Sequence, residues 1–283
     1  MSYAALVLGS PKGTSFGARP GGEGDNEAAA ARDASHLLVE MITPAKLSFT
    51  SDGTPYSEEY QDVYHSAAGG LEQARHVFLG GNELPARWRG RDAFTIVETG
   101  FGLGLNFLAA WQAWQEDPQR CSRLHFVSFE KHPFAADDLA LAHGRWPELA
   151  GLSAELREKW PAPAPGAQHL NFADGRIALT LYLGDASSLV AQLAVEADAY
   201  FIDGFAPAKN PELWSPQFLA ALTHSAAPGA TLATWSVAGA VRAGFAACGW
   251  SLEKREGFAH KREMLVGRRE KEPSPQPPSH GRG

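Results

Sequence analysis

Four acidic residues stand at or just after the ends of short apolar runs: Glu98, Glu130, Asp185 and Asp203. In open α/β sheets the carboxyl ends of the strands meet at one edge, and ligands bind there. Carboxylates gathered at one edge repel each other, so a cationic or hydrogen-bond-donating ligand should lie among them. Taken singly, each acid could equally cap the following helix or lie in water. Their recurrence on separate strands favours a binding site.

A glycine-rich turn follows the first of these acids and contains Gly100, Gly102 and Gly104. Glycines let the backbone approach a ligand where a Cβ atom would collide. The Gly-x-Gly-x-Gly spacing differs from the Gly-x-Gly-x-x-Gly pattern that binds a pyrophosphate in dinucleotide folds. An acid upstream of such a turn suits a cofactor with a cationic amino-acid group, so the pattern indicates S-adenosylmethionine. A plain structural turn is the alternative.

Three of the four acids have a plausible role toward that cofactor. Glu130 can accept hydrogen bonds from both ribose hydroxyls. Asp185 can meet the exocyclic amine of adenine, while the small Ala186 leaves room for the ring. Glu98 can bind the amino-acid end of the cofactor or orient the glycine turn.

The fourth acid begins the motif Asp203-Gly-Phe-Ala-Pro-Ala-Lys-Asn-Pro-Glu-Leu-Trp214. Methyl transfer to nitrogen requires an acceptor amine that is held in line and is unprotonated. We expect Asp203 to accept a hydrogen bond from this amine and to help remove its proton. Lys209 could bind a phosphate or perturb the local charge, and Phe205 could stack on a base. For Trp214 a place in the core is favoured.

The elements that must position these residues alternate between apolar runs and helical patterns, which is typical of a parallel sheet with helices on both faces. The predicted strands are 94–98, 124–130, 179–183, 199–203, 230–235, 250–255 and 264–267. The predicted helices are 105–116, 133–143, 187–195, 211–225 and 237–247.

Two hairpins are expected as departures from this pattern. The last two strands have no helix between them, which places one antiparallel strand in the sheet, as is typical of S-adenosylmethionine-dependent methyltransferases. The turn signal Asp174-Gly175 lies between strand-like runs and predicts a hairpin on the third strand. The fold class is therefore α/β: a Rossmann-like class I methyltransferase with a mostly parallel seven-stranded sheet, a terminal antiparallel hairpin strand, an N-terminal extension and a β-hairpin insertion.

Composition divides the chain into four parts. Residues 1–36 form a Gly/Ala-rich arm and residues 270–283 a Pro-rich tail, and both lack the large apolar side chains that would form a core. Residues 91–269 form the Rossmann-like domain. Residues 37–90 form an N-terminal extension that either only packs on this domain or also covers the cofactor and shapes the substrate pocket.

Charge and cysteine content limit the function classes. The net charge of −7 argues against indiscriminate nucleic-acid binding but allows a local basic face. For the C-terminal cluster Lys254, Arg255, Lys261, Arg262, Arg268 and Arg269, a solvated charged surface is the favoured interpretation, and an RNA-contacting face is the alternative. Cys121 and Cys248 fit reduced thiols, and no histidine spacing requires a metal. We expect a cytoplasmic protein without a membrane span or secretory signal.

Three motifs carry a resemblance to a known family: Glu98-Thr-Gly-Phe-Gly-Leu-Gly-Leu-Asn-Phe-Leu108, Phe129-Glu-Lys131 and Phe201-Ile-Asp-Gly-Phe-Ala-Pro-Ala-Lys-Asn-Pro211. They resemble the methyltransferase domain of the tRNA 5-methylaminomethyl-2-thiouridine biosynthesis enzyme MnmC, also found as stand-alone MnmD. The similarity extends over roughly residues 37–268. The motif at Asp203 is the most specific of the three.

The resemblance implies S-adenosylmethionine-dependent methylation of the amine of 5-aminomethyl-(2-thio)uridine at the tRNA wobble position. It implies tRNA as the partner, and a separate flavin-dependent oxidase or other enzyme that forms the aminomethyl group, since only the methyltransferase activity is expected of this chain. The cofactor-binding residues implied are Glu98, Gly100, Phe101, Gly102, Gly104, Asn106, Glu130, Lys131, Asp185 and Ala186. The catalytic residues implied are Asp203 and Lys209, and the substrate-binding residues are Tyr64, Asp62, Phe205 and Pro207.

Other functions stay open from the residues alone. A small-molecule amine methyltransferase would share the whole cofactor site. A nicotinamide-dependent oxidoreductase would call for the Gly-x-Gly-x-x-Gly spacing and no terminal hairpin. A catalytically silent nucleotide-binding module would have no need of Asp203.

Overall fold

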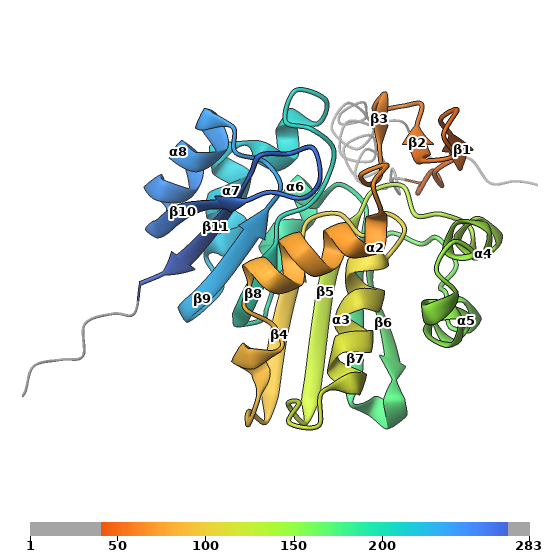
Figure 1. Ribbon diagram of the computed structural model, residues 1–283, viewed down its shortest axis with the longest axis horizontal. Helices are drawn as coiled ribbons and strands as arrows, with labels where there is room; N and C mark the ends of the chain where they lie inside the picture. Colours follow the sequence, from red (N-terminus) through yellow and green to blue (C-terminus); the bar gives the residue numbers. More distant parts are fainter. Residues whose placement is uncertain (1–40, 271–283) are drawn as a thin grey trace, which may run out of the picture. The chain divides into compact units, whose positions relative to one another are not determined.

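A single large sheet forms the centre of the computed structural model, which describes residues 41–270 (Figure 1). The predicted arm at 1–36 and all but the first residue of the predicted tail at 270–283 lie outside the described residues. The sheet has eight strands in the order β10-β11-β9-β8-β4-β5-β7-β6. Their bounds are β4 Ala93–Glu98, β5 Arg123–Glu130, β6 Gly166–Phe172, β7 Ile177–Leu183, β8 Ala197–Phe201, β9 Ala226–Thr234, β10 Trp250–Glu256 and β11 Glu263–Arg269.

The sheet is mostly parallel, as predicted, but it contains eight strands where the sequence predicted seven. The additional strand is β6, which pairs antiparallel with β7 from Gly166 opposite Leu183 to Phe172 opposite Ile177. This pair is the predicted insertion hairpin, and its pairing along the whole length of β7 makes β6 the edge of the main sheet. β11 lies antiparallel between β9 and β10. The sheet therefore has two antiparallel strands instead of one.

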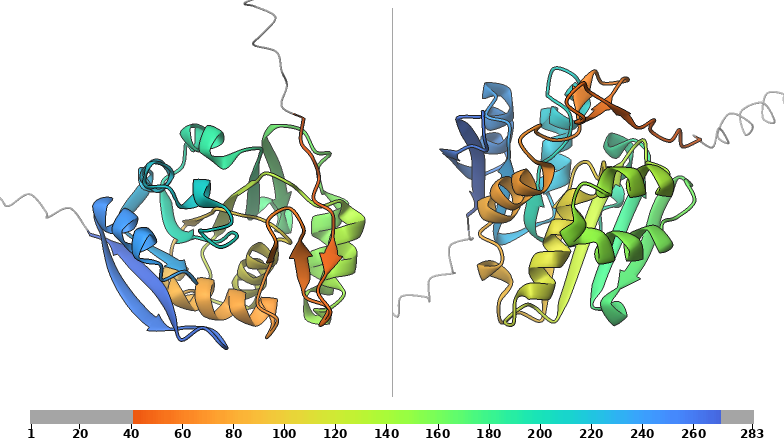
Figure 2. Two further views of the ribbon diagram at one scale, coloured as in Figure 1. Left: turned by 90° about the horizontal axis from the view of Figure 1, so that it is seen from above. Right: turned by 45° about the vertical axis from the view of Figure 1, so that its right-hand side comes forward.

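Helices cover both faces of the sheet (Figures 1 and 2). One face carries α3 Leu105–Glu116, α4 Ala136–His143 and α5 Ala150–Glu158. The other face carries α6 Ala186–Leu189, α7 Pro216–Thr223 and α8 Gly239–Ala247. Short helical turns are η2 Ala86–Trp88, η3 Pro147–Leu149, η4 Ala173–Gly175, η5 Val190–Gln192 and η6 Pro211–Trp214. Two buried apolar clusters, one on each face, form the core.

Two predicted helices differ from the structure. The helix predicted over 211–225 is interrupted: η6 ends at Trp214, and α7 begins at Pro216 with the Ser215 hydroxyl accepting a hydrogen bond from the Phe218 amide at 3.2 Å. Proline lacks an amide hydrogen and therefore favours the first position of a helix over its interior. The helix predicted over 187–195 is only the short α6 followed by η5.

The segment before β4 packs on the same face as α3. Its helix α2 Gly70–Gln73 continues into the π-helical η1 Ala74–Gly80, and Leu71, Phe78 and Trp88 are buried in that face's core. Before it, β1 Ser48–Phe49, β2 Pro55–Ser57 and β3 Asp62–Val63 form a small antiparallel sheet. This sheet lies at the upper edge of the large one in Figure 1.

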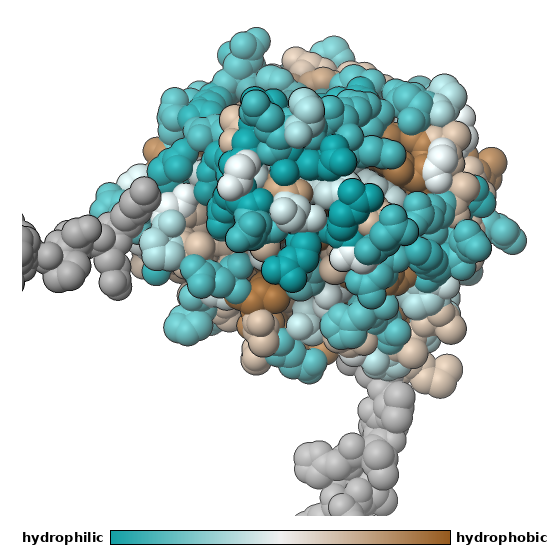
Figure 3. Space-filling view, turned by 90° about the horizontal axis from the view of Figure 1, so that it is seen from below, coloured by the Kyte–Doolittle hydropathy of each residue, from teal (hydrophilic) through white to brown (hydrophobic). Residues whose placement is uncertain are grey.

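The surface seen from below in Figure 3, away from the small sheet, is mostly hydrophilic with scattered hydrophobic residues. Within residues 41–270, no helix has both the length and the apolar character needed to span a membrane.

Candidate active site

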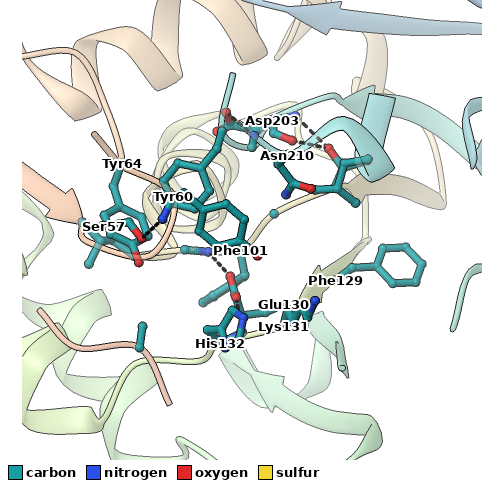
Figure 4. A pocket seen from close by; sticks show the side chains of 18 of the residues that line it. Ser57, Tyr60, Tyr64, Phe101, Phe129, Glu130, Lys131, His132, Asp203 and Asn210 are labelled. Atoms are coloured by element: carbon teal, nitrogen blue, oxygen red, sulfur yellow. Dashed lines mark hydrogen bonds between the residues drawn. The ribbon is translucent and has the colours of Figure 1, made fainter. Parts of the chain in front are cut away.

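A cavity of about 690 Å³ opens at the carboxyl ends of the central strands. Its walls come from the turn after β4, the end of β5, the loops after β7 and β8, and the N-terminal segment 43–65. Figure 4 shows Glu130 and Asp203 on opposite sides of the view, with the aromatic rings of Tyr60, Tyr64 and Phe101 between them. The cavity volume lies within the range of about 300–1,000 Å³ that small-molecule sites occupy.

Glu130, the last residue of β5, lines the cavity. Its Oε2 accepts a hydrogen bond from the Gly102 amide and its Oε1 accepts one from the His132 amide, each at 2.7 Å. Burial raises the pKa of this carboxyl, although both amides oppose the shift. Each carboxylate oxygen can accept a further hydrogen bond, so Glu130 can still bind two hydroxyl groups in the cavity.

Glu98, predicted to bind the cofactor, is fully buried and is not among the residues that line the cavity. Its Oε1 accepts from Asn106 Nδ2 at 2.8 Å and its Oε2 accepts from Ser128 Oγ at 2.7 Å. Desolvation raises the pKa of Glu98 well above its ordinary value. These bonds join the start of α3 to β5 beside the glycine turn, which the alternative prediction has Glu98 orient.

The glycine turn joins β4 to α3 with its backbone on the cavity wall. Gly104 precedes the first residue of α3 with a φ of 71°, and a Cβ there would approach the Phe101 ring to 2.7 Å. That ring is held by stacking on Trp160, with 5.5 Å between the ring centroids. Gly100 and Gly102 line the cavity, whereas Gly104 lies behind it.

Asp185 lies at the cavity wall beside Ala186, but part of its hydrogen-bonding capacity is used within the chain. Its Oδ1 accepts from the amides of Ser187 and Ser188, so Asp185 caps α6. Its Oδ2 lies 3.5 Å from Lys131 Nζ. The structure therefore shows the capping arrangement, with Lys131 paired to the other carboxylate oxygen of Asp185.

Asp203, which follows β8, is the most heavily bonded acid of the cavity. Its Oδ2 accepts from Asn106 Nδ2 at 2.8 Å, and its Oδ1 accepts from the Gly204 amide at 2.8 Å and from Trp235 Nε1 at 3.2 Å. Burial raises the pKa of Asp203, and these donors together with the charge of Lys261 oppose the shift. Because Asn106 donates to both Glu98 and Asp203, a single amide links the buried acid to the cavity acid.

The residues predicted to bind substrate lie around the loop after Asp203. Phe205 stacks on Tyr60 with 4.4 Å between centroids and meets the edge of Tyr64 at 5.1 Å. Asp62 Oδ2 accepts a hydrogen bond from the Ala206 amide at 3.0 Å, which ties the N-terminal extension to the loop. Lys209 lines the cavity, whereas Asp62 and Pro207 lie behind its wall.

Sequence reasoning missed Trp235 and Tyr60. Trp235 follows β9, and the strand-end rule that selected the four acids would have selected it had donors been considered along with acids. Tyr60 lies in the loop between β2 and β3, where no pattern distinguishes it from an ordinary exposed tyrosine. Its stacking on Phe205 places Tyr60 at the cavity.

The arrangement has two chemically different ends. At one end, Glu130 offers hydrogen-bond acceptors to a polar nucleoside, and the glycine turn lets the backbone approach that nucleoside closely. At the other end the half-buried, hydrogen-bonded carboxylate of Asp203 can accept from a donor such as an amine. Among residues 41–270, no group of three or more His, Cys, Asp or Glu side chains is placed to hold a metal ion.

Comparison with known proteins agrees with this geometry. Residues 147–270 match a protein family described as S-adenosyl-L-methionine-dependent methyltransferase. The chain is 63% identical over 227 residues to the tRNA 5-methylaminomethyl-2-thiouridine biosynthesis bifunctional protein MnmC of Azoarcus sp. (strain BH72), covering 80% of this chain and 36% of that protein. It is 60% identical over 227 residues to the protein of the same name from Aromatoleum aromaticum, with the same two coverages. The chain thus spans about a third of the length of these relatives.

A solved structure shows the same fold. The crystal structure of MNMC2 from Aquifex aeolicus matches with a TM-score of 0.64 and 24% sequence identity, over 81% of this chain and 71% of that one. The Rossmann-like class I fold, S-adenosylmethionine as cofactor and the resemblance to MnmC, each predicted from the sequence, are confirmed. In sequence and fold the chain is thus similar to S-adenosylmethionine-dependent methyltransferases and to MnmC proteins.

Proposed function

We propose that this chain methylates the primary amine of 5-aminomethyl-(2-thio)uridine at the tRNA wobble position, giving 5-methylaminomethyl-(2-thio)uridine. The names of its relatives support this substrate, since proteins 63% and 60% identical to the chain are named for the biosynthesis of 5-methylaminomethyl-2-thiouridine in tRNA. The observation that carries the proposal is the carboxylate of Asp203, held by three donors at one end of the cavity.

The cavity fits the cofactor at its other end. Glu130 would bind the ribose hydroxyls, Ala186 would leave room for the adenine, and the turn from Gly100 to Gly102 would place its backbone against the nucleoside. Phe101, Asn106 and Lys131 complete this side. When bound, S-adenosylmethionine supplies an electrophilic methyl group on a sulfonium.

Asp203 would act on the acceptor amine. Among residues 41–270 its Oδ2 accepts from Asn106 alone, which leaves a lone pair for the amine and later for its proton. Hydrogen bonds from Trp235 and Gly204 fix the other oxygen, so the carboxylate cannot rotate freely. Phe205, with Tyr64 against its edge, would contact the base, and Lys209 would neutralise nearby phosphate charge.

We also propose that different parts of the chain have different roles. Residues 91–269 would form the methyltransferase domain, and the extension before them would close the cavity through Tyr64 and Asp62, with Pro207 stiffening the loop opposite. The amine of the substrate would be produced by a flavin-dependent oxidase or another aminomethyl-forming activity.

The experiment incubates the protein and methyl-labelled S-adenosylmethionine with tRNA that carries 5-aminomethyluridine, followed by nucleoside analysis. Label in 5-methylaminomethyluridine is the expected result. Label in a free amine offered as competitor, with none in tRNA, would instead establish a small-molecule methyltransferase. A control tRNA with unmodified wobble uridine should remain unlabelled.

A further inference from the structure

The turn between β10 and β11, residues 257–262, lies beside the acceptor end of the cavity, and we call it the hairpin tip. β11 runs antiparallel to β9, and Leu265 pairs with Thr234, the last residue of β9, so the residues before β11 extend beyond the carboxyl end of β9. The dark-blue connection in Figure 1 follows this course. The hairpin tip therefore reaches the same edge of the sheet as Asp203.

The hairpin tip has a defined conformation. The Gly257 amide donates to the Arg262 carbonyl at 3.1 Å, and the Lys261 amide donates to the Phe258 carbonyl at 3.1 Å. A Cβ at Gly257 would collide with the Lys261 carbonyl, so the turn requires glycine. Phe258 packs against the core of the α3 face, which anchors the hairpin tip to the domain.

The cations of the hairpin differ between its stem and its tip. In the stem, Lys254 pairs with Glu263 at 2.7 Å and Arg268 pairs with Glu83 at 2.8 Å. At the tip, the exposed residues Lys261 and Arg262 form no ion pair with any carboxylate of residues 41–270. Of the basic cluster seen in the sequence, Lys254, Arg255 and Arg268 in the stem are thus paired with carboxylates, and Arg269 donates to the Cys248 carbonyl. Lys261 and Arg262 add unpaired positive charge at the tip.

Lys261 is directly connected to the acceptor end. Its Nζ lies 3.4 Å from the centroid of the Trp235 ring, and the Nε1 of the same ring donates to Asp203 Oδ1 at 3.2 Å. A cation over an indole face is attracted by the ring while its other side stays open to an anion. Although the residue is exposed, desolvation of its ammonium group by its neighbours lowers the pKa of Lys261, and the charges of Asp62 and Asp203 act in the opposite direction.

We propose that the hairpin tip binds the phosphate backbone of the RNA next to the acceptor nucleotide, with Lys261 and Arg262 as its phosphate ligands; this rests on the proposed function. The chain carries a net charge of −7 and acids line its cavity, so a polyanion needs free cations to approach Asp203. The hairpin tip supplies these cations, and the acids of the active site take no part in binding the phosphates.

The test measures tRNA binding by filter retention between 50 and 200 mM salt (about the range where phosphate contacts show their salt dependence) for the wild type, Lys261→Ala, Arg262→Ala and the double variant. Each single variant should weaken binding about three- to fivefold, and the double variant should lower the slope of log K against log salt by roughly 1.4 to 1.8. Arg123→Ala is the matched control, because Arg123 is an exposed cation at the amino end of β5, away from the cavity. Affinity for S-adenosylhomocysteine checks that the variants are folded.

The outcomes separate the two proposals. A wild type that methylates tRNA, together with a double variant of unchanged affinity and salt slope, overturns the role of the hairpin tip alone. An equal loss in Arg123→Ala also overturns it, because the effect would then be one of net charge. A wild type that neither binds nor methylates tRNA defeats the proposed function, and the assignment of the hairpin tip with it.

Discussion

The carboxylate of Asp203 is the side chain on which the proposed chemistry depends most. Asp203→Asn keeps the size of the side chain but removes the charge that would accept the amine proton, and it faces the Asn106 amide with a second amide. Turnover should fall by at least about 10²-fold, with a much smaller change in S-adenosylhomocysteine affinity. Single-turnover kinetics and calorimetry measure the two effects separately. An Asn variant with wild-type turnover would reduce Asp203 to a structural role.

The pH dependence of the methyl-transfer rate is a second test of Asp203. Burial raises the pKa of Asp203, so its charged form is lost at a higher pH than for an ordinary aspartate as the solution is acidified. The wild-type rate should rise with pH as both the carboxyl and the acceptor amine lose protons. In Asp203→Asn only the already neutral amine can react, so a given rate should require a higher pH. An unshifted profile would assign proton removal to solvent.

Glu130 should matter for the cofactor alone. Glu130→Ala removes the acceptor proposed for the ribose hydroxyls and leaves the Gly102 and His132 amides without a partner. Calorimetry should show S-adenosylhomocysteine binding weakened by about 1.5–3 kcal/mol. Glu148→Ala, a substitution in η3 outside the cavity lining, is the control. Equal affinities in wild type and Glu130→Ala would remove Glu130 from this role.

Substitution of Glu98 should change the pH dependence of the folding stability as well as the activity. Its raised pKa means that the folded state holds a proton that the unfolded state releases, so wild-type stability should fall as pH rises from the ordinary glutamate value toward the folded one. Glu98→Gln keeps both hydrogen-bonding positions without the titration and should flatten part of this fall. Thermal unfolding from pH 5 to 8 (roughly the span between ordinary and raised carboxyl pKa values) measures it. A variant that follows the wild-type curve would contradict a buried, protonated Glu98.

At the scale of elements, the glycine turn offers a sharp comparison. Gly104→Ala places a Cβ against the Phe101 ring at a residue with φ 71°, so both folding stability and cofactor affinity should fall, the former by about 1–3 kcal/mol. Gly151→Ala, in α5, meets no atom within 4 Å and should be neutral or stabilising. Denaturant unfolding compares them. Equal stabilities would show that the turn relaxes without cost.

The elements also show how far the sequence can be interpreted. The strands were predictable because buried parallel strands form continuous apolar runs, and α3 was predicted with its observed bounds because its apolar spacing is helical. α5 was missed, since only Ser153 and Leu156 of its residues are buried and its position depends on packing against α3 and α4. The strand-end acids could be located, but not the direction each faces. Amide groups of the chain donate hydrogen bonds to the oxygens of Asp185 and Glu98 and so compete with a ligand for them. Which amides come close enough depends on the three-dimensional packing, which the sequence pattern does not give.

At the scale of the whole molecule, the N-terminal extension joins the two ends of the cavity. His132, beside the cofactor end, contacts the Thr43 carbonyl at 3.0 Å, and Asp62 holds the Ala206 amide at the acceptor end. Asp62→Ala should free the loop after Asp203 and lower methyl transfer to tRNA by about tenfold, which is the value of one hydrogen bond to a charged group. Cofactor affinity should change by less than about twofold, because the cofactor end keeps its own contacts. Asp137→Ala, in the first turn of α4, is the matched control. If Asp62→Ala instead weakened cofactor and acceptor binding equally, the extension would act as one rigid cover over the cavity, and its two ends could not be loosened separately.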